Sequence, residues 1–443
     1  DLTDGSGTLD VSWNGLDVKA DARLQGAPVS FEYFREFTNS EDTRITASGQ
    51  LDTQSADEFG ISLRRFMRGT VGYDLQVFEK NNQYETISLN LNLRDTELYL
   101  EPLEWQKPRG APARASVMVL PPGSGSDAGF WQIEWFDVQA PDLSVSGQVL
   151  LDAAGRFIRA ESSELAITDK VDADLVVALE KDVLRADLTG RYLNADFLLR
   201  NLLSGREEAE AGKQQTSSSV PWPVPLLFHT DLDILKLRRD VTLKNFEASF
   251  SHDGLKTNDV YMSGNFEGGG YVAATMSKAR DYEIGRNLQL QTDNLSALAA
   301  GALGINSIQG GRADYTATLL NTGPVAGTFT ADNFVVSNAP FIARLLAAVS
   351  LDGLSDLLAG EGIEVSQVVA DMQFDQGSMN IVDARIVSPA IGISVNGAVD
   401  LASNNLDING ALAPAYQVNS MLGRVPGLGE LFVSRDGEGL VAF

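Results

Sequence analysis

The sequence predicts a mostly β protein built around a long antiparallel sheet, and three observations support that fold class. Apolar residues alternate with polar ones along many segments, a period of two that is typical of half-buried strands. The alternate positions are mostly Asp, Asn, Ser, Thr, Gln or Lys, so one face of each strand meets water, as antiparallel sheets allow. Segments with helical spacing are few and short, so helices cannot cover so many strands.

The alternating segments occur from one end of the chain to the other. We expect their apolar positions to lie on a single face of the sheet. In the first half of the chain these positions are Val71, Tyr73, Leu75, Val77, Ile87, Leu89, Leu91, Leu93, Val171, Ala173, Leu175, Val177 and Leu179. In the second half they are Phe228, Thr230, Leu232, Ile234, Ala313, Tyr315, Ala317, Leu319, Val368, Ala370, Met372, Phe374, Ile391, Ile393 and Val395.

A short glycine motif recurs between or within these segments, at 48–52, 146–149, 263–267 and 396–400. Glycine permits the positive φ of tight hairpins and bulges, so we expect a hairpin turn or a bulge at each motif. The recurrence has no fixed period, which favours an irregular meander over a propeller or a regular solenoid.

Three segments have helical spacing. Asn294 is placed to cap a helix over 295–303 that ends at Gly304, and a second stripe consists of Leu193, Phe197, Leu198 and Leu202. The longest runs over 340–359 and carries Ile342, Leu345, Leu346, Val349, Leu354, Leu357 and Leu358. We interpret these helices as lids or plugs on the apolar face of the sheet; insertion into a membrane surface is the alternative for the longest.

A polar, low-complexity linker followed by a Pro-rich stretch is predicted over 205–224. It separates an N-terminal β segment, 1–204, from a C-terminal β region, 225–443.

Composition excludes several classes of structure and function. The 443 residues are too many for one compact core, and the net charge, 34 − 60 = −26, would repel a nucleic-acid backbone. There is no cysteine, and no apolar run reaches the ~20 residues of a membrane-spanning helix. The chain begins without Met and stops inside an apolar run, so we expect a piece of a longer protein whose membrane anchor lies outside it.

The residues give little sign of catalysis. His229 and His252 are too few for a metal cluster, the nucleophile-elbow and P-loop motifs are absent, and residues 1–10 predict a polar hairpin in place of a calcium loop. We therefore expect no enzyme activity, cofactor or metal. A glycosidase-like pair of acids from distant strands stays open as a minor alternative.

Two small basic clusters stand out against the acidic background: Arg64, Arg65 and Arg68, and Lys236, Arg238 and Arg239. We interpret them as counter-charges, with contact to a phospholipid head group as the alternative.

Motifs in the last third of the chain occur in an order typical of one known family. They are FIARLLAAVSLDGL at 341–354, LAGEGI at 358–363, DAR at 383–385, SPAIG at 388–392, GAVD at 397–400, PAYQVNS at 414–420 and VPGLG at 425–429. On these motifs the sequence resembles the AsmA-like C-terminal region, specifically the YhdP branch. Weaker likenesses occur upstream, at 26–29, 33–37 and 105–110.

This resemblance implies a periplasmic protein of a Gram-negative envelope, anchored in the inner membrane by a segment absent from this sequence. The family is similar to TamB and to chorein-type bridge-like lipid transfer proteins, and it supplies no catalytic residues.

A long sheet with one apolar face and few helices needs something to cover that face. We therefore expect the sheet to curl into a groove, or β-taco, with an apolar interior that conducts phospholipids between the inner and outer membranes. The alternative is a non-catalytic scaffold or interaction protein of outer-membrane biogenesis, with other envelope proteins as partners.

Overall fold

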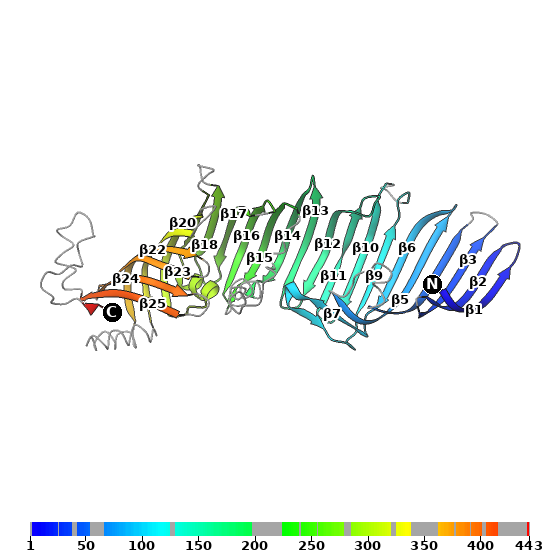
Figure 1. The fold of residues 1–443 in the computed structure, drawn as a ribbon, viewed down its shortest axis with the longest axis horizontal. Coiled ribbons are helices and arrows are strands. Elements are labelled where there is room, and N and C mark those ends of the chain that lie inside the picture. The colour runs from blue at the N-terminus through cyan, green and yellow to red at the C-terminus, as the bar shows by residue number, and fades with distance from the viewer. Residues whose placement is uncertain are drawn as a thin grey trace. The chain divides into compact units, whose positions relative to one another are not determined.

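The computed structural model describes residues 2–24, 26–37, 42–53, 66–124, 129–196, 224–238, 241–254, 256–278, 285–319, 325–337, 362–375, 378–389, 391–400, 405–414 and 441–442 (Figure 1). The chain forms two compact units, Asp1–Phe197 and Leu198–Phe443. The predicted linker over 205–224, apart from Val224, and the predicted helix over 340–359 lie outside the described residues.

The first unit is built from strands. They are β1 (Leu2–Val11), β2 (Gly15–Leu24), β3 (Ala27–Glu36), β4 (Thr43–Asp52), β5 (Met67–Lys80), β6 (Gln83–Asn92), β7 (Thr96–Leu100), β8 (Trp105–Lys107), β9 (Arg114–Leu120), β10 (Trp131–Ala140), β11 (Leu143–Leu151), β12 (Phe157–Ile167), β13 (Val171–Glu180) and β14 (Val183–Asn194). A short 3₁₀ turn, η2 (Glu101–Leu103), joins β7 to β8.

These strands follow one another in an antiparallel sheet. Strands β1 to β6 pair in chain order, β6 pairs with β9, and β9 to β14 continue in chain order. Strands β7 and β8 form a side hairpin, in which β7 pairs with the first residues of β5. The predicted fold class, mostly β with an antiparallel sheet, is confirmed for this unit.

The second unit repeats the arrangement with β15 (Leu226–Lys236), β16 (Thr242–His252), β17 (Thr257–Phe266), β18 (Tyr271–Lys278), β19 (Arg286–Thr292), β20 (Ile308–Leu319), β21 (Val325–Val336), β22 (Ile363–Asp375), β23 (Ser378–Val387), β24 (Ile391–Asp400), β25 (Asn405–Pro414) and β26 (Val441–Ala442). Each strand pairs antiparallel with the next. Between β19 and β20 lie the helix α3 (Leu295–Leu298) and the π-helical turn η4 (Ala299–Leu303).

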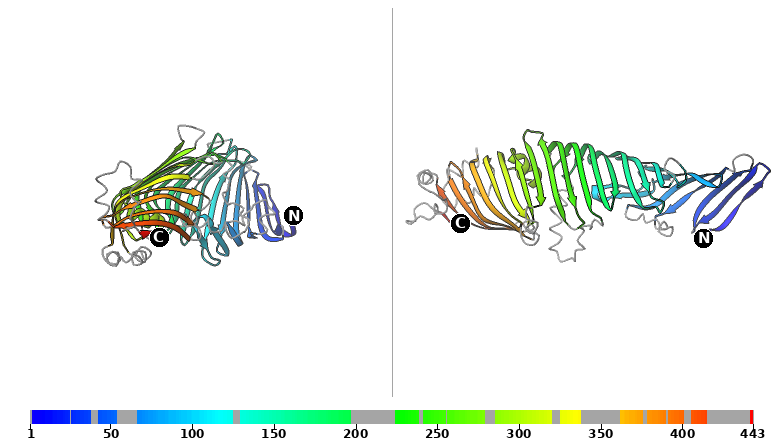
Figure 2. Two further views of the ribbon diagram at one scale, coloured as in Figure 1. Left: turned by 60° about the vertical axis from the view of Figure 1, so that its left-hand side comes forward. Right: turned by 90° about the horizontal axis from the view of Figure 1, so that it is seen from above.

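Shifts of register interrupt many of these pairings part-way along the strands. An extra residue on one strand bends it and increases the local twist. The strands of both units are accordingly bowed (Figure 2).

The predicted helix after Asn294 is confirmed. The Asn294 side chain accepts a hydrogen bond from the Ala297 N–H at 3.0 Å, as an N-cap residue does. Gly304, with a φ of 74°, ends the π-helical turn. No helix in the described part of the chain is long and apolar enough to cross a membrane.

Three local predictions need correction. Leu193, predicted on a helical stripe, lies in β14, where it stands opposite Val171, while Phe197, Leu198 and Leu202 of that stripe lie outside the described residues. Residues 2–11 form the single strand β1, bulged near Asp4, instead of a polar hairpin. The glycines of the four predicted motifs lie inside β4, β11, β17 and β24, so none of them forms a hairpin turn.

Close approach between strands explains the mid-strand glycines. A Cβ atom on Gly147 would lie 2.1 Å from the Glu161 carbonyl oxygen, and one on Gly397 would lie 2.1 Å from the Asp407 carbonyl oxygen. The register of β11 with β12 shifts at Gly147, so the bulge expected there is confirmed.

Candidate functional site

The register places the apolar positions predicted in the first unit on a single face. Tyr73, Leu75 and Val77 of β5 stand opposite Leu91, Leu89 and Ile87 of β6, and Val71 stands opposite Leu51 of β4. In β13, Leu175, Val177 and Leu179 stand opposite Leu188, Ala186 and Leu184 of β14. We call this the first apolar face; it runs from Leu9 and Val11 of β1 to β14.

Sequence reasoning missed part of this face. Strands β2, β3 and β9 to β11 also carry it, through Leu16, Val18, Phe31, Tyr33, Val117, Val119, Phe136, Val138, Val145 and Val149. The same alternation marks several of these strands, but bulges in β10 and β12 shift it part-way along.

The predicted positions of the second unit share a face in the same way. Tyr315 stands opposite Phe329, Leu319 opposite Val325, and Met372 opposite Ile381. Phe374 stands opposite Met379 and Val325, while Ile391, Ile393 and Val395 of β24 stand opposite Pro414, Leu412 and Gly410 of β25. Leu232 of β15 stands opposite Phe246. We call this the second apolar face. Ile234, by contrast, stands opposite the exposed Lys244, and the buried Leu235 beside it stands opposite the buried Leu243, so the alternation shifts after Leu232 and Ile234 does not share this face.

Burial on the first apolar face changes from one set of strand ends to the other. Val71, Ile167 and Val171 are 7%, 2% and 3% exposed, and all lie near the rim formed by the β4–β5 and β12–β13 connections. Leu75, Leu89, Leu91, Val177 and Leu179, further along the strands, are half-buried. The face is therefore packed along this rim and partly open to solvent further along the strands.

Leu93 belongs to the packed part. It lies one residue beyond β6, is 2% exposed, and its carbonyl oxygen accepts a hydrogen bond from the buried Lys107 ammonium at 2.7 Å. Although it was predicted to line the groove, it is enclosed by protein.

The second apolar face has a protein lid at one end. Leu295 of α3 packs with Ala313, Ala331, Phe334 and Val365, all buried. The interpretation of this helix as a lid on the sheet is confirmed at this place. Leu232, 0% exposed, is also enclosed, whereas the predicted residues Ile234, Tyr315, Leu319, Met372, Phe374, Ile393 and Val395 are half-buried.

Tyrosines add hydroxyl groups to both faces. The Tyr73 hydroxyl lies 3.0 Å from where a Gly49 Cβ would be, and the Tyr315 ring packs edge-on against Phe374 with centroids 6.3 Å apart. Burial raises the pKa of both hydroxyls, and the Tyr315 hydroxyl has no hydrogen-bond partner in the described part of the chain. Both groups therefore stay neutral near pH 7.

Two of the hollows that described residues outline include predicted groove positions in their lining. One of about 930 Å³ is lined by polar residues such as Asp74, Asn90 and Arg114 together with Tyr73 and Leu91, and one of about 520 Å³ by Gln289, Thr328 and Asp371 together with Met372. Each is local to a few strands, so a continuous groove along the sheet stays a proposal.

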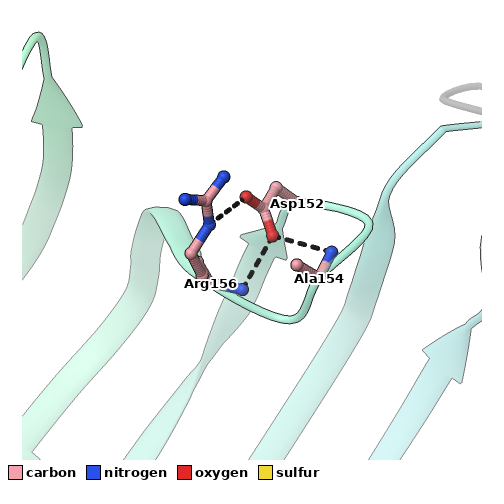
Figure 3. A network of polar contacts seen from close by, with 3 residues as sticks. All are labelled: Asp152, Ala154 and Arg156. Atoms are coloured by element: carbon pink, nitrogen blue, oxygen red, sulfur yellow. Dashed lines mark hydrogen bonds and ion pairs between the residues drawn. The ribbon is translucent and has the colours of Figure 1, made fainter.

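A small polar network holds a turn of the first unit (Figure 3). In the β11–β12 connection, Asp152 Oδ1 accepts from the backbone N–H groups of Ala154 and Arg156, both at 2.9 Å, and Oδ2 accepts from Arg156 Nε at 2.6 Å. The hydrogen bond from the Arg156 backbone, above all, holds the pKa of the Asp152 carboxyl below its usual range. This arrangement fixes the turn.

The other predicted polar residues lie apart. His229 is on β15 and His252 ends β16, where its Nδ1 accepts from the Gly254 N–H at 3.0 Å. The guanidinium of Arg68 lies 5.4 Å from the Tyr99 ring centroid. Lys236 ends β15, Arg238 follows it, and Arg64, Arg65 and Arg239 lie outside the described residues. The described residues contain no group of acidic or histidine side chains able to hold a metal.

Comparison with known proteins found no matching family model, no matching curated protein and no matching solved structure. The resemblance to the AsmA-like family therefore stays a prediction from the sequence motifs.

Proposed function

We propose that the two apolar faces hold the acyl chains of phospholipids, and that the chain is a segment of a bridge conducting phospholipids between the inner and outer membranes of a Gram-negative bacterium. The observation that carries the proposal is the continuity of each apolar face across its strands, with a packed rim along one side and half-buried residues beyond it. The bowed sheet would form the trough, with head groups at its open side.

The energetics favour a hydrocarbon ligand. Moving a ~16-carbon acyl chain from a bilayer into water costs roughly 0.8 kcal/mol per CH₂, about 12 kcal/mol in all. An apolar trough removes most of that barrier without breaking a covalent bond, so the proposed activity needs no catalytic residue.

Leu91→Asp tests the proposal. Leu91 is half-buried on the first apolar face, next to Tyr73. A carboxylate there would meet the acyl chains, so we expect phospholipid measured by mass spectrometry of the gently purified protein to fall well below the wild-type amount.

Asn90→Asp is the matched control. Asn90 precedes Leu91 on the same strand but is exposed on the polar face, where its Oδ1 accepts from Ser116. We expect Asn90→Asp to retain phospholipid, and both variants to keep the β circular-dichroism spectrum. A reproducibly lipid-free wild-type protein would contradict the proposal and favour the scaffold.

A further inference from the structure

A hollow on the polar face of the first unit is lined by residues of neighbouring strands. It is the hollow of about 930 Å³ that includes Tyr73 and Leu91. The side chains of those two residues belong to the first apolar face, so here they contribute main-chain atoms. The polar lining residues face the other way, and strand pairing sets them side by side in two rows: Gln50, Gly72, Asn92, Arg114 and Gln139, and Ser48, Asp74 and Asn90. Since Gly72 has no side chain, it leaves a gap in the first row.

Several hydrogen-bonding groups at this hollow have no partner in the described part of the chain. Asn92 accepts a hydrogen bond at Oδ1 from the Arg94 N–H at 3.1 Å, but its own amide N–H groups donate to no described residue. Asp74 accepts at Oδ1, but it accepts from no described residue at Oδ2. The Gln50 amide and the Arg114 guanidinium form no hydrogen bond or ion pair with described residues. The hollow therefore offers free donors and free acceptors together.

A ligand rich in hydroxyl groups fits this set of donors and acceptors. Each hydroxyl group both donates and accepts hydrogen bonds, so it needs both kinds of partner. The opposite charges of Asp74 and Arg114 balance, so they do not select for an ion. Pro112 and Pro141 also line the hollow and supply apolar surface, which suits the C–H groups of a sugar ring. These features together favour a carbohydrate.

An exposed tryptophan lies further along the same face. The register of β10 with β9 shifts between Ile133 and Trp135, and this bulge directs Trp135 to the polar face, where it stands opposite Met118 and is 40% exposed. Trp135 and Gln139 lie on the same side of β10, about 13 Å apart at the usual rise per residue of a strand. A sugar ring stacks its C–H groups on an exposed aromatic plane, so a ligand of several rings contacts both Trp135 and the hollow.

We propose that the polar face of the first unit binds an extended, neutral oligosaccharide, with one sugar ring stacked on Trp135 and another hydrogen-bonded to Asn92 and Arg114 in the hollow. Asp137 lies between Trp135 and the hollow on β10, and the net charge of the chain is −26, so an acidic sugar is repelled. The site lies on the face opposite the proposed lipid contacts, and the inference does not depend on lipid binding.

Isothermal titration calorimetry of the full chain with cellotetraose and with tetra-N-acetylchitotetraose tests the proposal. Both sugars are neutral and extended, and we expect at least one of them to bind at millimolar concentration or below. Tetragalacturonate has the same number of rings but a carboxylate on each, so it should bind at least about tenfold more weakly than the better neutral sugar.

Trp135→Ala removes the stacking surface and should weaken binding of the neutral sugar at least about tenfold. Trp135→Phe keeps an aromatic ring and should restore most of the affinity. Tyr84→Ala is the control, because Tyr84 is 55% exposed near the start of β6, away from the hollow, and its loss should leave binding unchanged.

Asn92→Asp tests the hollow. Asp keeps the acceptor for the Arg94 N–H but loses the free amide donors, so binding should weaken about tenfold while the fold is retained. Asn81→Asp adds the same charge at an exposed position before β6, at the other end of that strand, and should bind the sugar as the wild type does.

Three results would overturn the proposal. They are the absence of binding by both neutral sugars, equal binding of tetragalacturonate, and wild-type affinity in both Trp135→Ala and Asn92→Asp. The last result would place the sugar elsewhere on the chain.

Discussion

Replacing Lys107 with Met would test what holds the β7–β8 hairpin on the first unit. Lys107 is 2% exposed, and its ammonium donates to the carbonyl oxygens of Leu93, Arg94 and Thr96 at 2.7, 3.2 and 2.6 Å. Met has a similar length but no donor, so these carbonyls would lose this partner.

The expected magnitude follows from burial. The bonds to Leu93 and Thr96 are buried. The Leu93 carbonyl keeps a second donor, the Thr96 N–H at 3.3 Å, whereas a buried carbonyl that loses its partner costs about 1–3 kcal/mol, and bonds to a charged donor are at the stronger end. Burial also lowers the pKa of Lys107, because desolvation disfavours the ammonium, and this penalty offsets part of the gain. We expect Lys107→Met to lower the local free energy of unfolding by about 3 kcal/mol.

Hydrogen exchange is the suitable assay, because a chain with two compact units need not unfold in one two-state transition. The Gly110 N–H, bonded to the Arg94 carbonyl at 2.7 Å, reports on this region. A loss of about 3 kcal/mol accelerates its exchange roughly 150-fold.

Lys19→Met supplies the control. Lys19 contacts Glu32 at 3.4 Å across strands, and its side chain is 56% exposed. Exposed ion pairs contribute about 0–1 kcal/mol, so little change is expected. If Lys107→Met accelerates exchange no more than Lys19→Met does, the ammonium does not hold the hairpin.

Three further predictions concern other parts of the fold. Asp152→Asn should remove a contribution to stability that depends on pH. The pKa of the Asp152 carboxyl is lowered in the folded state, so this contribution is present above the unfolded-state pKa and is lost as the pH falls through the folded-state pKa. Thermal melts of both proteins from neutral to acid pH would reveal the difference. Gly147→Ala should destabilise by about 1–3 kcal/mol in urea, because its Cβ meets the neighbouring strand, whereas Gly129→Ala, with open space around it, should be near neutral. Leu295→Ala should lower the free energy of unfolding of the second unit by about 2–5 kcal/mol, because Leu295 lies in a packed core. Leu91→Ala should lower that of the first unit by less, because Leu91 is half-buried. Equal losses in urea unfolding would mean that the two positions are equally packed.

The strands could be predicted because their signal is local. Alternation along 71–77 and 171–179 located β5 and β13 directly, and Asn294 and Gly304 located the ends of the short helical segment. A half-buried strand imposes its period on its own sequence, so no knowledge of its partners is needed.

Features that depend on a distant partner could not be predicted in this way. Gly147 looked like a turn residue, but it is required by the Glu161 carbonyl of the next strand. Lys107 bonds to carbonyls 11 to 14 residues earlier, and a single lysine gives no pattern that would indicate burial.

Alternation also does not distinguish an apolar side chain that is open to solvent or a ligand from one that is enclosed by protein. Leu232 and Leu91 occupy the same kind of position in their strands, yet Leu232 is 0% exposed while Leu91 is half-buried. What separates such positions is what packs over them, as α3 packs over Ala313 and Phe334. Any acyl chain bound to these sheets must therefore lie along the half-buried rows, away from the packed rims. Those rows, more than the full set of alternating positions, are where a substitution can distinguish lipid binding from ordinary packing.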